Sequence, residues 1–97
     1  MATGRILAVD DERFFREILL EILVGAGHLV RAVESGEAAL AALAEESYDV
    51  LVTDIVMPGI DGVTLVREAK KRDPDLETIA ITGHDDVRLA VGAMKAG

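Results

Sequence analysis

Short apolar runs alternate along the chain with longer segments in which apolar residues recur every three or four positions. The runs have the length of β-strands and cover residues 5–9, 29–33, 50–53 and 78–81. The segments with helical spacing include residues 15–26, 37–43, 63–69 and 87–94. The pattern predicts four strands, each followed by a helix.

The predicted strands are rich in Val, Ile and Leu with little polar alternation, which is typical of strands buried on both faces. Parallel strands need crossover connections, and the helices supply them. We therefore expect one domain over residues 1–97 with an α/β fold, a flavodoxin-like doubly wound parallel sheet. Right-handed crossovers in the strand order 2-1-3-4 would place the first and third strands side by side. Gly25 and Gly27 are expected to end the first helix, and Asp61 to cap the third.

The composition is that of a folded protein and argues against two classes of function. Of the 97 residues, 51% are hydrophobic and 29% are charged, which is enough for one modest core. The net charge of -8 argues against direct nucleic acid binding, since such binding depends on an excess of Lys and Arg. The first residues lead into a strand-length run, without the apolar region of a leader or a membrane helix. We therefore expect a cytoplasmic protein with no membrane contact.

Acidic residues follow two of the predicted strands. Asp10 and Asp11 come after the first run, Asp54 after the third, and Thr82 follows the fourth. The carboxyl ends of parallel strands meet at one edge of a sheet, so these side chains are expected to converge. Two carboxylates about 4 Å apart repel each other by roughly 4 kcal/mol at an effective dielectric of about 20, which favours a bound cation. Mg²⁺ suits the site because it prefers oxygen ligands and commonly joins one or two carboxylates to a phosphate.

Turn chemistry offers a simpler explanation for any one of these residues. An Asp after a strand is often only a turn or helix-capping residue, and this interpretation stays open for Asp10 and for Asp11 taken alone. Turn preferences do not require polar residues at three different strand ends on one rim, however. The conjunction favours a site.

Four short sequence stretches are distinctive. Three lie at the ends of predicted strands, where the candidate site residues are, and the fourth lies at the end of the last predicted helix. They are VDDE at residues 9–12, TDIVMPGIDG at residues 53–62, ITGH at residues 81–84 and AMKAG at residues 93–97. In this order and register they resemble the successive motifs of response-regulator receiver domains, the phosphoacceptor domains of two-component signalling systems. The resemblance runs the whole length of the chain.

The resemblance implies that Asp54 is the phosphoacceptor and a metal ligand, and that Asp11 binds Mg²⁺ directly. Asp10 would act mostly through bound water, and Val56 would lend its main-chain carbonyl to the metal. Thr82 would contact the phosphoryl group and report its presence. The phosphoryl group would come from a sensor histidine kinase and would switch an output domain, which normally lies C-terminal to the receiver. Such a domain is not an enzyme; at most it catalyses its own phosphorylation and dephosphorylation.

The chain departs from the family pattern after its fourth predicted helix. Receivers continue with a fifth strand that carries a Lys, and with a final helix, whereas this chain stops at Gly97. Lys95 is no substitute, because the family places its stretch ahead of the fifth strand. Without that strand, residues 78–81 would form an open apolar sheet edge. We therefore expect a homodimer or larger assembly, through pairing of this edge or an exchange of the fourth helix between chains.

Two other functions compete with that of a phosphoacceptor. One is a receiver-like interaction module that keeps the fold but no longer converts phosphorylation into a signal. The other is a Mg²⁺-dependent aspartyl-phosphate phosphatase of the haloacid dehalogenase type. Such enzymes have Asp-x-Asp at the strand end, but Val56 occupies the second position here, which removes the usual proton-transfer carboxylate.

Four further residues carry weaker signals. His84 follows Thr82 by two residues on a loop that would cover the crevice, so it is a candidate for modulating access. His28 is expected to be a solvated loop residue, since no second His or Cys lies near it in sequence. Phe15 is expected in the core, and Phe14 on a partner surface.

Overall fold

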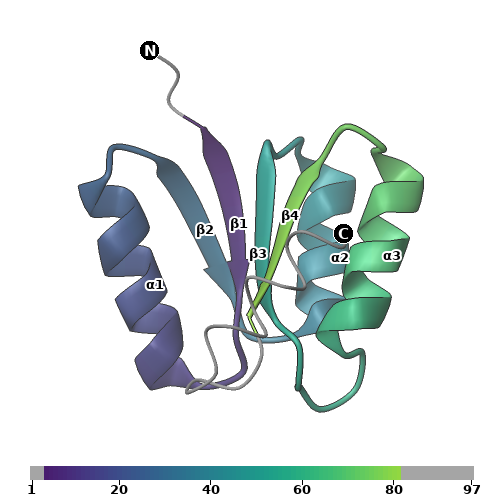
Figure 1. Cartoon of the computed structure of the whole chain (residues 1–97), viewed down its shortest axis with the longest axis horizontal. Coiled ribbons are helices and arrows are strands. Elements are labelled where there is room, and N and C mark those ends of the chain that lie inside the picture. The colour runs from purple at the N-terminus through teal and green to yellow at the C-terminus, as the bar shows by residue number, and fades with distance from the viewer. Residues whose placement is uncertain (1–3, 82–97) are drawn as a thin grey trace.

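A four-stranded parallel sheet with helices on both faces forms the described part of the chain (Figure 1). The computed structural model describes residues 4–81. Its strands are β1 (Arg5–Val9), β2 (Leu29–Val33), β3 (Val50–Asp54) and β4 (Glu77–Ile81). Its helices are α1 (Arg13–Gly25), α2 (Gly36–Glu45) and α3 (Gly62–Arg72).

The strand order is β2-β1-β3-β4, and all neighbouring strands are parallel. Figure 1 shows α1 on one face of the sheet and α2 with α3 on the other. The predicted flavodoxin-like α/β fold and its order 2-1-3-4 are thus confirmed. The helix predicted at residues 87–94 lies outside the described residues.

The buried core lies between the sheet and the layer of α2 and α3. Leu7 of β1, Leu51 of β3 and Leu65 of α3 are all completely buried there, together with Ala39 and Ala42 of α2. Complete burial of one Leu side chain contributes about 1.5–3 kcal/mol. The two central strands are therefore held most firmly, and their last residues are placed with them.

The face covered by α1 is packed less completely. α1 contains no fully buried residue, and Phe14 is 67% exposed. The expectation that Phe15 belongs to the core is wrong, because this side chain is only half-buried and stacks edge-on against Phe14 at 5.3 Å between ring centres. Among the described residues, α1 is the one helix on its face, so its outer side has no described neighbour.

Local hydrogen bonds explain where the helices begin and end. Asp61 caps α3 as predicted, because its carboxylate accepts a hydrogen bond from Thr64 N at 2.8 Å. This bond from a backbone N–H lowers the pKa of Asp61. Ser35 caps α2 in the same way. α1 ends at Gly25, and Gly27 adopts the left-handed φ of 93° that a side chain would disfavour.

His28 is not the solvated residue that the sequence suggested. It is half-buried, and its Nδ1 accepts a hydrogen bond from Gly4 N at 3.3 Å. The reason is strand pairing: β2 begins beside the start of β1, with Leu29 N donating to Gly4 O, so His28 is carried onto Gly4.

Two expectations concern the outside of the molecule. Over residues 4–81, no helix has the length and apolar character needed to cross a membrane. Among the described strands, β4 pairs only with β3. The homodimer expected through its other edge stays a prediction.

Candidate functional site

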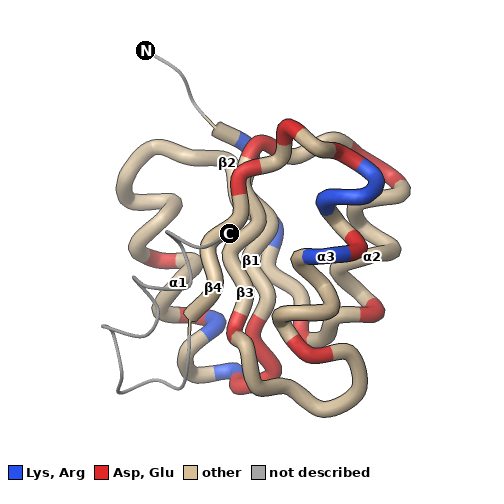
Figure 2. Tube along the Cα trace, turned by 45° about the vertical axis from the view of Figure 1, so that its right-hand side comes forward, with Lys and Arg blue, Asp and Glu red and all other residues tan. Residues whose placement is uncertain are grey.

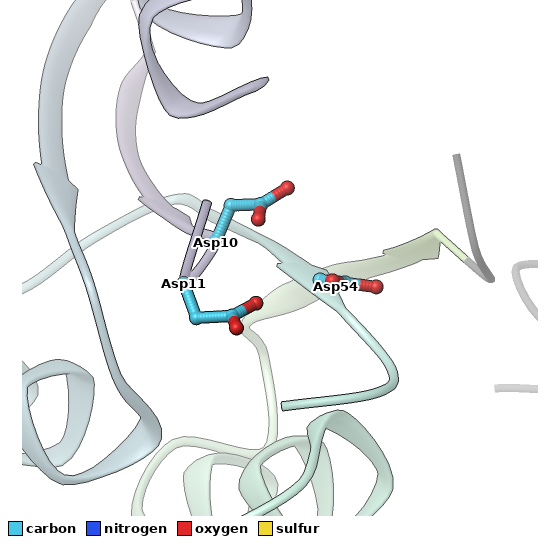
Figure 3. A group of neighbouring side chains, drawn as sticks. All are labelled: Asp10, Asp11 and Asp54. Carbon is cyan, nitrogen blue, oxygen red and sulfur yellow. The ribbon is translucent and has the colours of Figure 1, made fainter. Parts of the chain in front are cut away.

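Three carboxylates meet at the carboxyl-terminal edge of the sheet. β1 and β3 are direct neighbours with Val9 opposite Thr53, so the residues that end or follow them reach the same edge. The side chains of Asp10 and Asp11 extend from the end of β1 toward the side where Asp54 lies (Figure 3). One carboxylate oxygen from each residue lies within 4.8 Å of the others. The structure thus brings these three residues together, as the strand order predicted.

The three carboxylates differ in burial. Asp10 and Asp54 are only 3% and 4% exposed, whereas Asp11 is exposed. Burying a carboxylate is unfavourable unless hydrogen bonds or a cation compensate for the lost water. Asp11 therefore lies on the solvent side of the cluster, where a cation from solution would arrive first.

Backbone bonds fix the turn that carries Asp10. Its N–H donates to Val33 O at 3.2 Å, and its Oδ1 accepts from Glu12 N at 2.9 Å. Arg16 Nη1 donates to the main-chain oxygen of Asp10 at 2.8 Å. Asp10 is therefore a turn residue, but a carboxylate has about four acceptor positions, so this role is compatible with binding a cation.

Asp54 is the last residue of β3 and is placed by the sheet. The hydroxyl of Thr53 donates to the main-chain oxygen of Asp54 at 2.8 Å. Val56 N approaches Asp54 Oδ1 at 3.4 Å, which is a long and weak hydrogen bond. Val56 is 72% exposed, so this residue lies on the rim of the site.

The geometry suits a hard divalent cation. Two oxygens bound to one Mg²⁺ lie at most about 4.2 Å apart, because each Mg–O distance is about 2.1 Å. The three carboxylate oxygens lie within 4.8 Å of one another, so a small side-chain rotation or one intervening water is enough to accommodate the ion. A bound cation would offset the mutual repulsion and leave a carboxylate oxygen beside it as a nucleophile.

The structure also identifies contributors that the sequence analysis missed. Arg16 holds the main chain at Asp10, and Gly36 of α2 lies against Ile60 of the loop that follows Asp54. The position of Arg16 in the first turns of the helix after Asp10 was a usable signal. Thr82 and His84, which the sequence assigned to the site, lie outside the described residues.

Known proteins resemble the chain along its length. The family described as "Response regulator receiver domain" matches residues 6–97. The DNA-binding transcriptional regulator NtrC of Salmonella typhimurium is 42% identical over 97 residues, which are 100% of this chain and 21% of that protein. The response regulator receiver protein CpdR of Brucella abortus is 42% identical over 85 residues, or 88% of this chain and 71% of that protein. The chain thus spans about a fifth of the NtrC relative and most of CpdR.

Solved structures share the fold. The apo receiver domain of nitrogen regulatory protein C in solution has a TM-score of 0.78 and 42% identity, covering 100% of this chain and 78% of that one. The response regulator protein TrrA from Thermotoga maritima, in complex with Mg(2+)-BeF, has a TM-score of 0.82 and 36% identity, covering 94% and 79%. Fold, acidic edge and sequence agree, and the chain belongs to the response regulator receiver domain family.

Proposed function

We propose that the chain is a phosphoacceptor receiver domain in which Asp54 takes a phosphoryl group from a histidine kinase. An oxygen of Asp54 attacks the phosphorus, and the bond between phosphorus and the imidazole nitrogen of the donor breaks. The electron pair of that bond stays on the nitrogen. The protein's contribution is to place the nucleophile and to neutralise charge, as in other phosphoryl transfers.

The observation that carries this proposal is the convergence of Asp10, Asp11 and Asp54 at one edge of the sheet. The three carboxylates of this cluster, together with the main-chain carbonyl of Val56, would hold Mg²⁺. When bound, Mg²⁺ supplies positive charge that stabilises the transferring phosphoryl group. The related TrrA structure, at 36% identity, is a complex with Mg(2+)-BeF, which supports the choice of ion.

Partners follow from the relatives. NtrC and the C4-dicarboxylate regulator DctD of Rhizobium meliloti are transcriptional regulators of which this chain matches 21%. By analogy, phosphorylation of Asp54 would switch an attached or associated output domain. Thr82 is proposed to contact the phosphoryl group, and His84 to modulate access to it.

Chemical phosphorylation tests the proposal. The chain is incubated with phosphoramidate and Mg²⁺, and the intact protein is weighed by mass spectrometry. One added phosphoryl group is expected in the wild type and in Asp75→Asn, which alters an exposed turn residue. None is expected in Asp54→Asn or after chelation by EDTA. Labelling that persists in Asp54→Asn would refute the assignment.

A further inference from the structure

The loop between β3 and α3 starts at the proposed phosphoacceptor and is tied down at both ends. Ile55 N donates to Ile81 O at 2.9 Å, and Gly62 N donates back to Ile55 O at 2.8 Å. Between these ties the loop carries Val56, whose main-chain carbonyl is a proposed metal ligand. Figure 1 shows the loop at the lower edge of the molecule, the same edge at which α2 begins.

The middle of the loop rests on the first residue of α2. Ile60 is half-buried and packs against the core cluster, and Gly36 is buried beneath it. A Cβ atom at position 36 would lie 2.8 Å from Ile60 Cβ and 2.9 Å from Ile60 O. Carbon atoms pack best at about 3.5–4.0 Å, so the loop comes this close only because position 36 has no side chain.

A second contact lies next to the first. Gly59 has a left-handed φ of 75°, and a Cβ there would lie 2.7 Å from the Glu37 carboxylate. Consecutive residues of the loop, Gly59 and Ile60, therefore meet consecutive residues of α2, Gly36 and Glu37. The packing of the loop against the start of α2 thus fixes how closely the loop approaches this helix.

We propose that Gly36 is a positioning residue for the cation site. Because it has no side chain, Gly36 allows Ile60 to pack closely against α2. This contact fixes the position of the loop and thereby the position of the Val56 carbonyl relative to Asp54. Alanine at position 36 would displace Ile60 by about 0.7 Å or more if normal contact distances are restored. This inference rests on the proposed function, because it assumes that the three-carboxylate edge binds a divalent cation.

The two common divalent cations should respond differently to this displacement. Mg²⁺ demands near-ideal octahedral geometry at about 2.0–2.1 Å, whereas Ca²⁺ accepts six to eight ligands in flexible geometry at about 2.3–2.6 Å. A misplaced carbonyl therefore weakens Mg²⁺ binding more than Ca²⁺ binding. A general loss of stability would weaken both ions alike, so the ratio of the two affinities separates positioning from unfolding.

The test is a calorimetric titration of the full chain with Mg²⁺ and with Ca²⁺. For Gly36→Ala we expect the Mg²⁺ dissociation constant to rise about fivefold or more, and the Ca²⁺ constant to rise less than about twofold, given their coordination preferences. Gly25→Ala is the matched control, because a Cβ at that helix-terminal glycine meets nothing within 4 Å. It should bind both ions like the wild type.

A second pair of variants covers the case in which Gly36→Ala does not fold. Ile60→Ala removes the side chain beyond Cβ, including Cγ2, whereas Ile60→Val keeps both Cβ and Cγ2, the side-chain atoms nearest to position 36. Mg²⁺ affinity should fall more in Ile60→Ala than in Ile60→Val, with Ca²⁺ again less affected. Equal losses for both ions, or Mg²⁺ binding by folded Gly36→Ala that matches Gly25→Ala, would overturn the role of Gly36. A wild-type chain that binds no Mg²⁺, or that binds it equally in Asp54→Asn, would instead overturn the proposed function, and this inference with it.

Discussion

Two acidic side chains near the amino-terminal edge of the sheet pair with arginines, whereas three at the carboxyl-terminal edge gather near one another. Near the first edge, Glu46 pairs with Arg5 at 3.4 Å and Glu45 with Arg31 at 3.0 Å. At the second edge, three carboxylates gather within 4.8 Å. Figure 2 shows red segments gathered where β1 and β3 end, with blue segments at the start of α1 next to them, and red and blue segments at the opposite edge.

The contrast distinguishes charges that are paired within the chain from the three that are proposed to form a site. Opposite charges that pair on the surface contribute little, and they need nothing from outside the chain. Like charges held together by neighbouring strand ends oppose folding, and such a conflict is expected where a protein binds or reacts.

The largest predicted effect comes from breaking the acidic edge at its exposed member. Asp11→Asn should weaken Mg²⁺ binding by about tenfold or more, because a neutral amide replaces a charged oxygen ligand. Backbone amide shifts in an NMR titration with Mg²⁺ measure the affinity. Asp75→Asn, the exposed turn control, should bind like the wild type. Unchanged affinity in Asp11→Asn would remove this residue from the site.

Without a cation, neutralising one buried carboxylate should stabilise the fold. Asp54→Asn keeps the shape of the side chain and removes one of three like charges, so the free energy of unfolding should rise by roughly 1–2 kcal/mol. At the opposite edge, Glu46→Gln removes an attraction and should lower the same quantity by at most about 0.5 kcal/mol. Urea unfolding in EDTA measures both. Changes of the same sign in the free energy of unfolding for the two variants would contradict the proposed difference between the two edges.

The smallest effect concerns pH at the amino-terminal edge. Burial is the main cause that raises the pKa of Tyr48, and its hydroxyl donates to Glu46 at 3.1 Å. With a folded-state pKa above the unfolded value of about 10, the stability from the neutral phenol is fully present below pH 10 and is lost as pH rises through the folded-state pKa. Tyr48 is the single tyrosine and no tryptophan is present, so tyrosinate absorbance reports it alone. A titration midpoint of Tyr48 in the folded chain that is equal to or lower than its midpoint in the urea-unfolded chain would contradict a raised pKa.

Strand order and acidic convergence could be predicted because they depend on local patterns that the fold then enforces. Apolar runs place the strands, parallel strands share a carboxyl edge, and Asp10, Asp11 and Asp54 must then meet. The capping role of Asp61 could be predicted equally well, since a helix cap is a local interaction. The hydrogen bond from Arg16 to the Asp10 carbonyl and the packing of Ile60 on Gly36 were not predicted. They depend on how separate elements pack in three dimensions, as does the partial burial of Phe15 and His28.

Beryllofluoride binding tests the central claim most directly. This phosphoryl mimic should attach to Asp54 only when Mg²⁺ is bound at the acidic edge, and fluorine NMR detects the attached form. Bound fluorine resonances are expected when Mg²⁺ and beryllofluoride are both present, in the wild type and in Asp75→Asn but not in Asp54→Asn. Bound resonances that persist without Mg²⁺ or in Asp54→Asn, or their absence from the folded wild type at saturating Mg²⁺, would contradict it.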